Sequence, residues 1–162
     1  HNLVNKTVTI SLLTALGKLD NIQLVIAGHV RGADTQLTAS ETAELAALPS
    51  VVFAPQGAAS VSLIKQCDVL IDVDASIALD AIQLGKLYVR PKYLQDASVE
   101  TIYDTLGGAV QASSEQEMVA LLSTAVLPTN VVSPMFTEIV IGDVASNISK
   151  QYYLKLKALT QQ

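Results

Sequence analysis

The sequence is poor in aromatic residues, in charge and in cysteine. Its 162 residues include no Trp, five Tyr and two Phe, only 15% of them are charged, and the formal net charge is −5. Scattered basic residues and few stacking rings argue against a nucleic-acid partner. No run approaches the roughly 18 apolar residues of a membrane span, so we expect none. The single Cys67 excludes an internal disulfide and a cysteine-rich metal centre, and its place before an apolar strand predicts a small core residue.

Several catalytic motifs are also missing. The chain contains neither a Gly-x-Ser-x-Gly elbow nor a Cys–His arrangement, so no nucleophile–base pair is visible. Gly-x-Gly-x-x-Gly and Gly-Lys-Ser/Thr phosphate loops are absent, which argues against a dinucleotide cofactor and an ATPase, and we expect no cofactor. The N-terminus lacks a basic region followed by an apolar run, so no signal peptide is predicted. His1 indicates a tag remnant or a chain cut from a longer protein.

What the sequence does contain is a regular alternation of short apolar runs and amphipathic stretches. Half of its residues are hydrophobic. This pattern predicts an α/β fold with a doubly wound, Rossmann-like parallel sheet, three α/β/α layers and right-handed crossovers, in one domain over residues 1–162. Predicted strands cover residues 22–27, 51–54, 68–73, 87–89 and 109–111. Predicted helices cover residues 6–19, 38–48, 59–66, 76–84, 98–106 and 134–140, with another opening at Ser114 and a terminal crossover helix at 144–160.

The stretch from Cys67 to Lys86 is the centre of this fold. It predicts a buried strand, an acidic turn with Asp72 and Asp74, and a helix. Ligands of open α/β sheets bind outside the carboxyl ends of the strands, and the start of the next helix offers free N–H groups to phosphate. Asp80 lies four residues after Ser76, so its carboxylate can accept hydrogen bonds from a ribose diol while Ser76 holds a phosphate.

Two other interpretations of the acidic turn stay open. Asp74 and Ser76 suit the N-terminal end of the following helix, whose first amides they would cap. Asp72 and Asp74 would alternatively hold a metal ion, although no His or Glu cluster lies near them in the sequence.

Further candidate residues follow the first two predicted strands at the same edge of the sheet. His29 and Arg31 lie in a Gly-flanked loop, where together they can bind an anionic diphosphate. Gln56 and Gly57 lie in the next exit loop, where backbone groups can meet a nucleobase. The competing interpretation for both loops is an ordinary solvated surface.

Arg90 and Lys92 come after the predicted strand 87–89. Either side chain can neutralise a phosphate at the carboxyl edge of the sheet. The competing interpretation is surface charge.

The order of these features resembles the C-terminal domain of GT-B nucleotide-sugar enzymes. The segment from Leu63 to Arg90, with its acidic turn and its Leu84-Gly85-Lys86 helix end, is similar to UDP-sugar 2-epimerases and to CDP-glycerol and sialyl-type polymer transferases. Gly28-His29 resembles a phosphate-binding loop, and residues 142–148 are similar to the Gly-Asp-Gly-x-Ala-Ser-x-x-Ile segment that opens the final helix. The resemblance covers most of the chain, through the order and spacing of its motifs.

The resemblance implies roles for the residues of the turn. Asp74, Ala75 and Ser76 would meet the diphosphate, and Asp80 would bind the ribose. Val73 stands where the family carries an Asp. The Ile-Asp-Val-Asp sequence of this turn looks closer to catalytically silent GT-B subunits that chaperone bacterial protein O-glycosylation.

The resemblance therefore implies the donor-binding half of a bacterial nucleotide-sugar-dependent glycosyltransferase, with UDP as the expected nucleotide, in glycan, cell-surface polysaccharide or glycoprotein synthesis. Its partners would be the nucleotide sugar and an N-terminal Rossmann-like domain or partner subunit, so the isolated domain is expected to be inactive; a homo-oligomer stays open. The implied location is cytoplasmic, with membrane association only through the missing part or a partner. The alternatives are a UDP-sugar 2-epimerase domain, a non-catalytic GT-B-like interaction subunit and an unrelated Rossmann-like binding domain.

Overall fold

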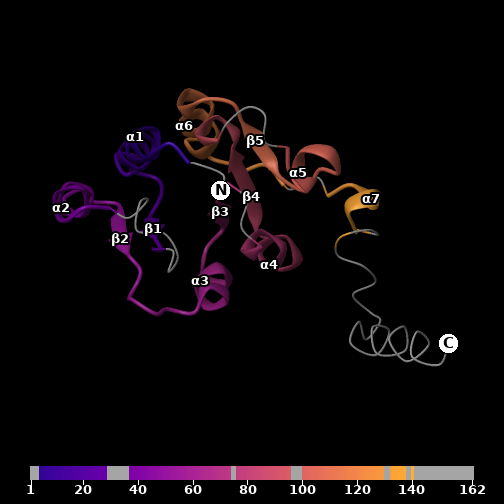
Figure 1. The fold of residues 1–162 in the computed structure, drawn as a ribbon, viewed down its shortest axis with the longest axis horizontal. Coiled ribbons are helices and arrows are strands. Elements are labelled where there is room, and N and C mark those ends of the chain that lie inside the picture. Colours follow the sequence, from indigo (N-terminus) through magenta and orange to yellow (C-terminus); the bar gives the residue numbers. More distant parts are fainter. Residues whose placement is uncertain are drawn as a thin grey trace.

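The computed structural model describes residues 4–28, 37–73, 76–95, 100–129, 132–137 and residue 140. Helices and strands alternate along these segments as predicted, and Figure 1 shows the strands between two groups of helices. Within these segments no helix is both long and apolar enough to cross a bilayer. The elements are, in order, α1 (Lys6–Leu16), β1 (Leu24–Ile26), α2 (Ala39–Ala46), β2 (Val51–Phe53), α3 (Ser60–Gln66), β3 (Val69–Ile71), α4 (Ile77–Gln83), β4 (Leu87–Pro91), η2 (Lys92–Leu94), α5 (Ile102–Thr105), β5 (Val110–Ala112), α6 (Glu115–Leu122) and α7 (Pro134–Phe136).

The strands form two parallel sheets. β1 pairs with β2, and Val25 lies opposite Val52. β4 lies between β3 and β5, with Val89 opposite both Ile71 and Val110. The mixed α/β architecture with parallel strands is thus confirmed. The described strands are divided between two sheets because no backbone ladder joins β1 to β3 in these segments, so a single continuous sheet is not what they form.

The central strand β4 is buried on both faces. Leu87 and Val89 belong to a core cluster with residues of α1 and α6. Tyr88, between them, belongs to a second cluster with residues of α4, α5 and α7. Successive side chains of a strand point to opposite faces, so helices cover the β3–β4–β5 sheet on both sides, as Figure 1 shows. Full burial of such a side chain contributes about 1.5–3 kcal/mol to folding.

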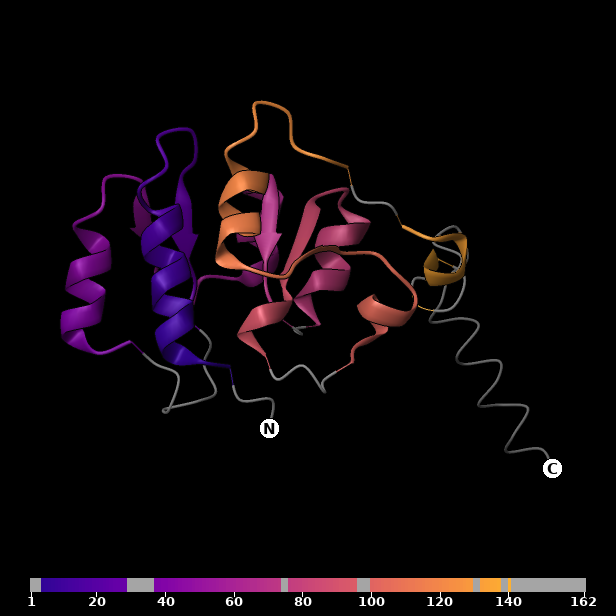
Figure 2. The same cartoon turned by 90° about the horizontal axis from the view of Figure 1, so that it is seen from above.

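Two helices begin at the residues that the sequence predicts. Thr38 Oγ1 accepts a hydrogen bond from Glu41 N at 3.3 Å, and the Glu41 carboxylate accepts one from Thr38 N at 2.6 Å, which completes a capping box. Ser114 Oγ accepts a hydrogen bond from Glu117 N at 3.1 Å at the start of α6. Glu41 also lies 2.8 Å from Lys6 Nζ, so the cap of α2 is tied to α1, which lies beside it in Figure 2.

Some boundaries differ from the prediction. β4 runs two residues beyond its predicted end at Val89, because Arg90 and Pro91 continue the ladder with β5. α5 occupies only part of the predicted helix 98–106, because Thr101 caps it and the helix begins after that residue. α7 covers Pro134–Phe136, and residues 137 and 140 of the predicted helix 134–140 are also helical, whereas the predicted terminal helix 144–160 lies outside the described residues.

Gly17 ends α1 where the chain passes close to its neighbours. A Cβ atom at Gly17 would lie 2.7 Å from Leu48 Cδ1 and 2.7 Å from Val51 Cγ2. Gly17→Ala is therefore expected to destabilise the protein by about 1–3 kcal/mol, measured as a lower urea midpoint. Gly28→Ala is the control, since a Cβ there meets nothing within 4 Å among the described residues, and its effect should stay within about 0.5 kcal/mol. Equal losses for the two variants would contradict the steric argument.

Candidate functional site

The acidic turn lies at the carboxyl end of β3, as predicted. It begins with Asp72 and reaches α4 at Ser76, while Asp74 and Ala75 lie outside the described residues. Asp72 N donates a hydrogen bond to Val89 O at 3.3 Å, which extends the pairing of β3 with β4 by one residue. The start of the turn is therefore attached to the central strand.

Ser76 and Asp80 lie at the start of α4. Ser76 occupies the N-cap position, but its backbone is helical (φ −58°, ψ −23°) and its exposed side chain makes no capping hydrogen bond. Ser76 thus does not cap α4 with its hydroxyl, contrary to one of the interpretations of the sequence. Asp80 is half-buried, and its carboxylate has neither a hydrogen bond nor an ion pair within the described residues. Residues four apart share one side of a helix, so both groups face the same way.

Arg90 occupies a different place from the predicted one. It belongs to β4, and its side chain is 0% exposed. Its Nε donates to Val73 O at 2.8 Å, its Nη1 to both carboxylate oxygens of Asp104 at 2.6 and 2.8 Å, and its Nη2 to Gln95 Oε1 at 2.6 Å. The predicted exposed cation is thus a buried one. Its charge is compensated internally, and the guanidinium has no surface from which to contact a phosphate.

Asp104, the partner of Arg90, was missed by the sequence reasoning. Its carboxylate also accepts hydrogen bonds from Thr101 N at 2.8 Å, Thr101 Oγ1 at 3.1 Å and Gln111 Nε2 at 3.0 Å, and lies 3.3 Å from Lys92 Nζ. Burial by itself raises the pKa of this carboxyl, but the hydrogen bonds from Thr101 and Lys92 and the charge of Arg90 outweigh burial, so the pKa lies below its ordinary value. The Thr-x-x-Asp capping spacing was the available sequence signal.

Two buried polar atoms after β4 lack a partner in the described structure. Gln95 is only 8% exposed, and because its Oε1 accepts a hydrogen bond from Arg90, its Nε2 is left without one. Tyr93 Oη is also buried without a partner, and burial, together with the charge of Glu115, raises the pKa of Tyr93 to about 12. Both groups are neutral donors that a water molecule or a ligand oxygen would satisfy. Nothing in the sequence pattern singled them out.

The other predicted residues lie in loops. Gln56 and Gly57 follow β2 and are exposed, and Gly57 has a φ of +80°, a conformation that favours glycine. No hydrogen bond joins this loop to the acidic turn among the described residues. His29 and Arg31 lie outside the described residues, so the anion-binding pair stays a prediction.

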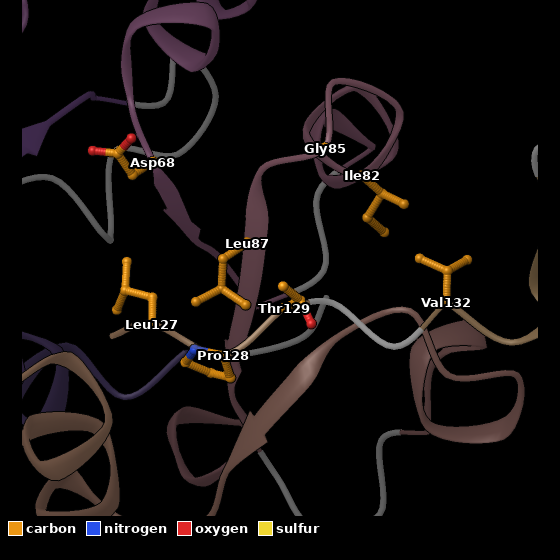
Figure 3. A pocket seen from close by; sticks show the side chains of 8 residues that line it. All are labelled: Asp68, Ile82, Gly85, Leu87, Leu127, Pro128, Thr129 and Val132. Atoms are coloured by element: carbon orange, nitrogen blue, oxygen red, sulfur yellow. The ribbon is translucent and has the colours of Figure 1, made fainter. Parts of the chain in front are cut away.

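A pocket of about 300 Å³ lies at the opposite end of the strands (Figure 3). It is formed by the residue before β3, the start of β4, the end of α4 and the segment after α6. Its lining residues are Asp68, Ile82, Gly85, Leu87, Leu127, Pro128, Thr129 and Val132. Most of these side chains are apolar. The sequence reasoning placed the ligand at the other edge and did not foresee this pocket.

Within the described residues, no group of three or more His, Cys, Asp or Glu side chains is placed to hold a metal ion. The metal site of Asp72 and Asp74 stays untested because Asp74 lies outside those residues. Cys67 is half-buried, its Sγ donates to Ile64 O at 3.3 Å, and burial raises the pKa of its thiol. A raised pKa argues against a reactive thiolate, but Cys67 belongs to neither core cluster, so it is not the buried core residue that the sequence predicted.

Comparisons of the chain with family models, with curated proteins and with solved structures found no match. The resemblance to GT-B enzymes therefore stays a prediction that rests on the order of the motifs. Functional conclusions have to rest on the geometry of the chain itself.

Asp104→Asn is expected to destabilise the protein most strongly at neutral pH. Without the carboxylate, Arg90 is buried without a counter-charge, which costs about 3–5 kcal/mol. The pKa of Asp104 in the folded protein lies below the ordinary value of 3.8. The carboxylate's contribution is therefore fully present above that value and is lost as the pH falls through the folded-state pKa. Urea unfolding of both proteins, from about pH 7 down to about pH 2, measures the difference.

The difference in free energy of unfolding between wild type and Asp104→Asn should narrow as the pH falls below 3.8, the ordinary pKa of an Asp carboxyl. Lys92→Ala is the control, because the Lys92 side chain is 36% exposed and such a pair contributes at most about 1 kcal/mol. A gap for Asp104→Asn that stays constant over the whole pH range would show that the ionised carboxylate is not what stabilises the fold.

Proposed function

We propose that this chain binds the nucleotide of a nucleoside diphosphate sugar at the carboxyl end of β3, as the donor-binding half of a glycosyltransferase. The observation that carries the proposal is the Asp80 carboxylate, which is half-buried one helical turn after Ser76 and has no partner within the described residues. A partly buried carboxylate has lost hydration, so hydrogen bonds from a ligand stabilise it. The two hydroxyls of a ribose are donors of this kind.

The positions of Ser76 and Asp80 suggest how such a ligand is oriented. Side chains four residues apart on a helix are separated by roughly 5–6 Å between Cβ atoms. That span suits the separation of a ribose from its own phosphates. The ribose would lie against Asp80, and the diphosphate would lie toward Ser76 and the backbone N–H groups of the turn.

The phosphate charge has to be compensated by groups other than Arg90, whose guanidinium is enclosed by Asp104 and Gln95. The remaining candidates are backbone N–H groups, the exposed Ser76 hydroxyl and the predicted pair of His29 and Arg31. Stabilising a leaving nucleoside diphosphate by such donors is what sugar transfer requires. We propose UDP as the nucleotide. We expect binding without turnover by this chain alone, because the resemblance places the acceptor site in the other half of the enzyme.

One observation favours a different class of function, a non-catalytic interaction subunit. Val25 and Val52 lie opposite each other on β1 and β2 and are 45% and 44% exposed. Adjacent exposed apolar side chains on a sheet face are a feature of surfaces that a partner protein covers. Under this alternative, the acidic turn binds no nucleotide.

Asp80→Asn is expected to weaken UDP binding about tenfold or more, because a hydrogen bond to a charged group contributes about 1.5–3 kcal/mol. Calorimetric titration of wild type and variant measures the loss. Asp68→Asn is the matched control. Asp68 is exposed and lies directly before β3, at the end of that strand opposite to the proposed site, and the change in charge is identical. The control should bind UDP as tightly as wild type.

A UDP analogue without the 2′ and 3′ hydroxyls sharpens the test. Wild type and Asp80→Asn should bind this analogue equally, because the group that Asp80 contacts is gone. An equal loss in Asp80→Asn and Asp68→Asn would indicate a general charge effect and no ribose contact. If UDP, CDP and GDP all fail to bind wild type at millimolar concentration, the donor-binding proposal is wrong and the interaction subunit is favoured.

A further inference from the structure

Two side chains of β4 form hydrogen bonds with the backbone directly after β3. Tyr88 and Arg90 are two residues apart, so they lie on the same face of the strand. Tyr88 Oη donates a hydrogen bond to Asp72 O at 3.2 Å, and Arg90 Nε donates one to Val73 O at 2.8 Å. Two consecutive carbonyls at the start of the acidic turn are therefore held by side chains. These bonds add to the backbone bond from Asp72 N to Val89 O.

Arg90 is itself held in one position. Its Nη1 contacts both carboxylate oxygens of Asp104, and its Nη2 contacts Gln95 Oε1, with every distance at or below 2.8 Å. The guanidinium is planar, so fixing Nη1 and Nη2 also fixes the direction of Nε. Any displacement would separate a buried charge from its counter-charge, which is strongly unfavourable.

The anchor of Arg90 extends over several segments. Asp104 accepts hydrogen bonds from both Thr101 N and Thr101 Oγ1, from Gln111 of β5 and from Lys92 of η2. The position of the turn is thereby tied to η2, α5 and β5, which all lie after β4 in the chain.

We propose that Arg90, assisted by Tyr88, is a positioning residue for the acidic turn and contacts no ligand itself. Arg90 holds the carbonyl of Val73 and Tyr88 holds that of Asp72; together they set where the chain enters α4 and hence where Ser76 and Asp80 stand at the edge of the sheet. The expected effect of this positioning role on ligand binding rests on the proposed nucleotide site. Its effect on the position of the turn is independent of that site. A lysine cannot replace Arg90, because a single ammonium lacks the fork that joins Val73, Asp104 and Gln95.

The experiment measures amide hydrogen exchange at Asp72, Val73 and Ser76–Asp80 by NMR, together with UDP titration. In Arg90→Lys we expect exchange at these amides to become about tenfold faster or more, because the charged hydrogen bond to the turn is lost. UDP affinity should fall about tenfold as well. Leu45→Ala is the control, because Leu45 is buried in α2 and belongs to neither the core cluster against which Val73 packs nor the one that contains Tyr88; its loss lowers the thermal midpoint without removing a contact to the turn.

The outcomes separate the positioning role of Arg90 from the proposed binding of a nucleotide. Faster exchange at the turn in Arg90→Lys, but not in Leu45→Ala, supports the positioning role, even if wild type binds no UDP and the proposed function is wrong. Equal exchange at the turn in the two variants overturns the positioning role, even if wild type binds UDP. If Arg90→Lys does not fold, Tyr88→Phe decides, since it removes only the hydroxyl that contacts Asp72 O; unchanged exchange at Asp72 and Val73 in this variant also overturns it.

Discussion

The buried charge of Arg90 is the constraint on which the arrangement around β4 depends. Removing a guanidinium from water costs several kcal/mol, and only a close carboxylate with further hydrogen bonds offsets that cost. Asp104 must therefore lie within reach at the first turn of α5, where Thr101 supplies two more donors. Gln95 must turn its Oε1 inward, which leaves its Nε2 buried and without a partner in the described structure. The carbonyl of Val73 is the remaining hydrogen-bond partner of the guanidinium, so the same buried charge also fixes the backbone directly after β3.

The two ends of the β3–β4–β5 sheet consequently differ in chemistry. At the carboxyl end, side chains hold the carbonyls of Asp72 and Val73, and Ser76 and the carboxylate of Asp80, which has no partner within the described segments, follow at the start of α4. At the amino end lies a mostly apolar pocket. Recognition of a polar, charged ligand requires hydrogen-bonding groups on a rigid frame, and the carboxyl end combines the two. Because Arg90 is enclosed, recognition of an anion there has to rely on backbone and side-chain groups other than its guanidinium.

Much of the fold and part of the candidate site could be predicted from local sequence patterns. The order of helices and strands follows from apolar periodicity, and the starts of α2 and α6 follow from the Thr38 and Ser114 caps. Ser76 and Asp80 were correctly placed at the start of α4, because the sequence predicts a helix over residues 76–84, directly after the acidic turn. Periodicity and caps involve residues within about one or two helical turns of each other, so they can be read from the chain before it folds.

The sequence by itself thus determined which segments become helices and parallel strands, and which polar residues follow β3. Only the tertiary structure decided that Arg90 is buried, that the described strands form two sheets and that the pocket lies at the amino end. Arg90 and Asp104 are 14 residues apart, and Tyr88 and Asp72 are 16 apart. Contacts at such separations depend on how whole elements pack. An arginine after an apolar strand looks the same in the sequence whether it ends up in solvent or beside a buried carboxylate.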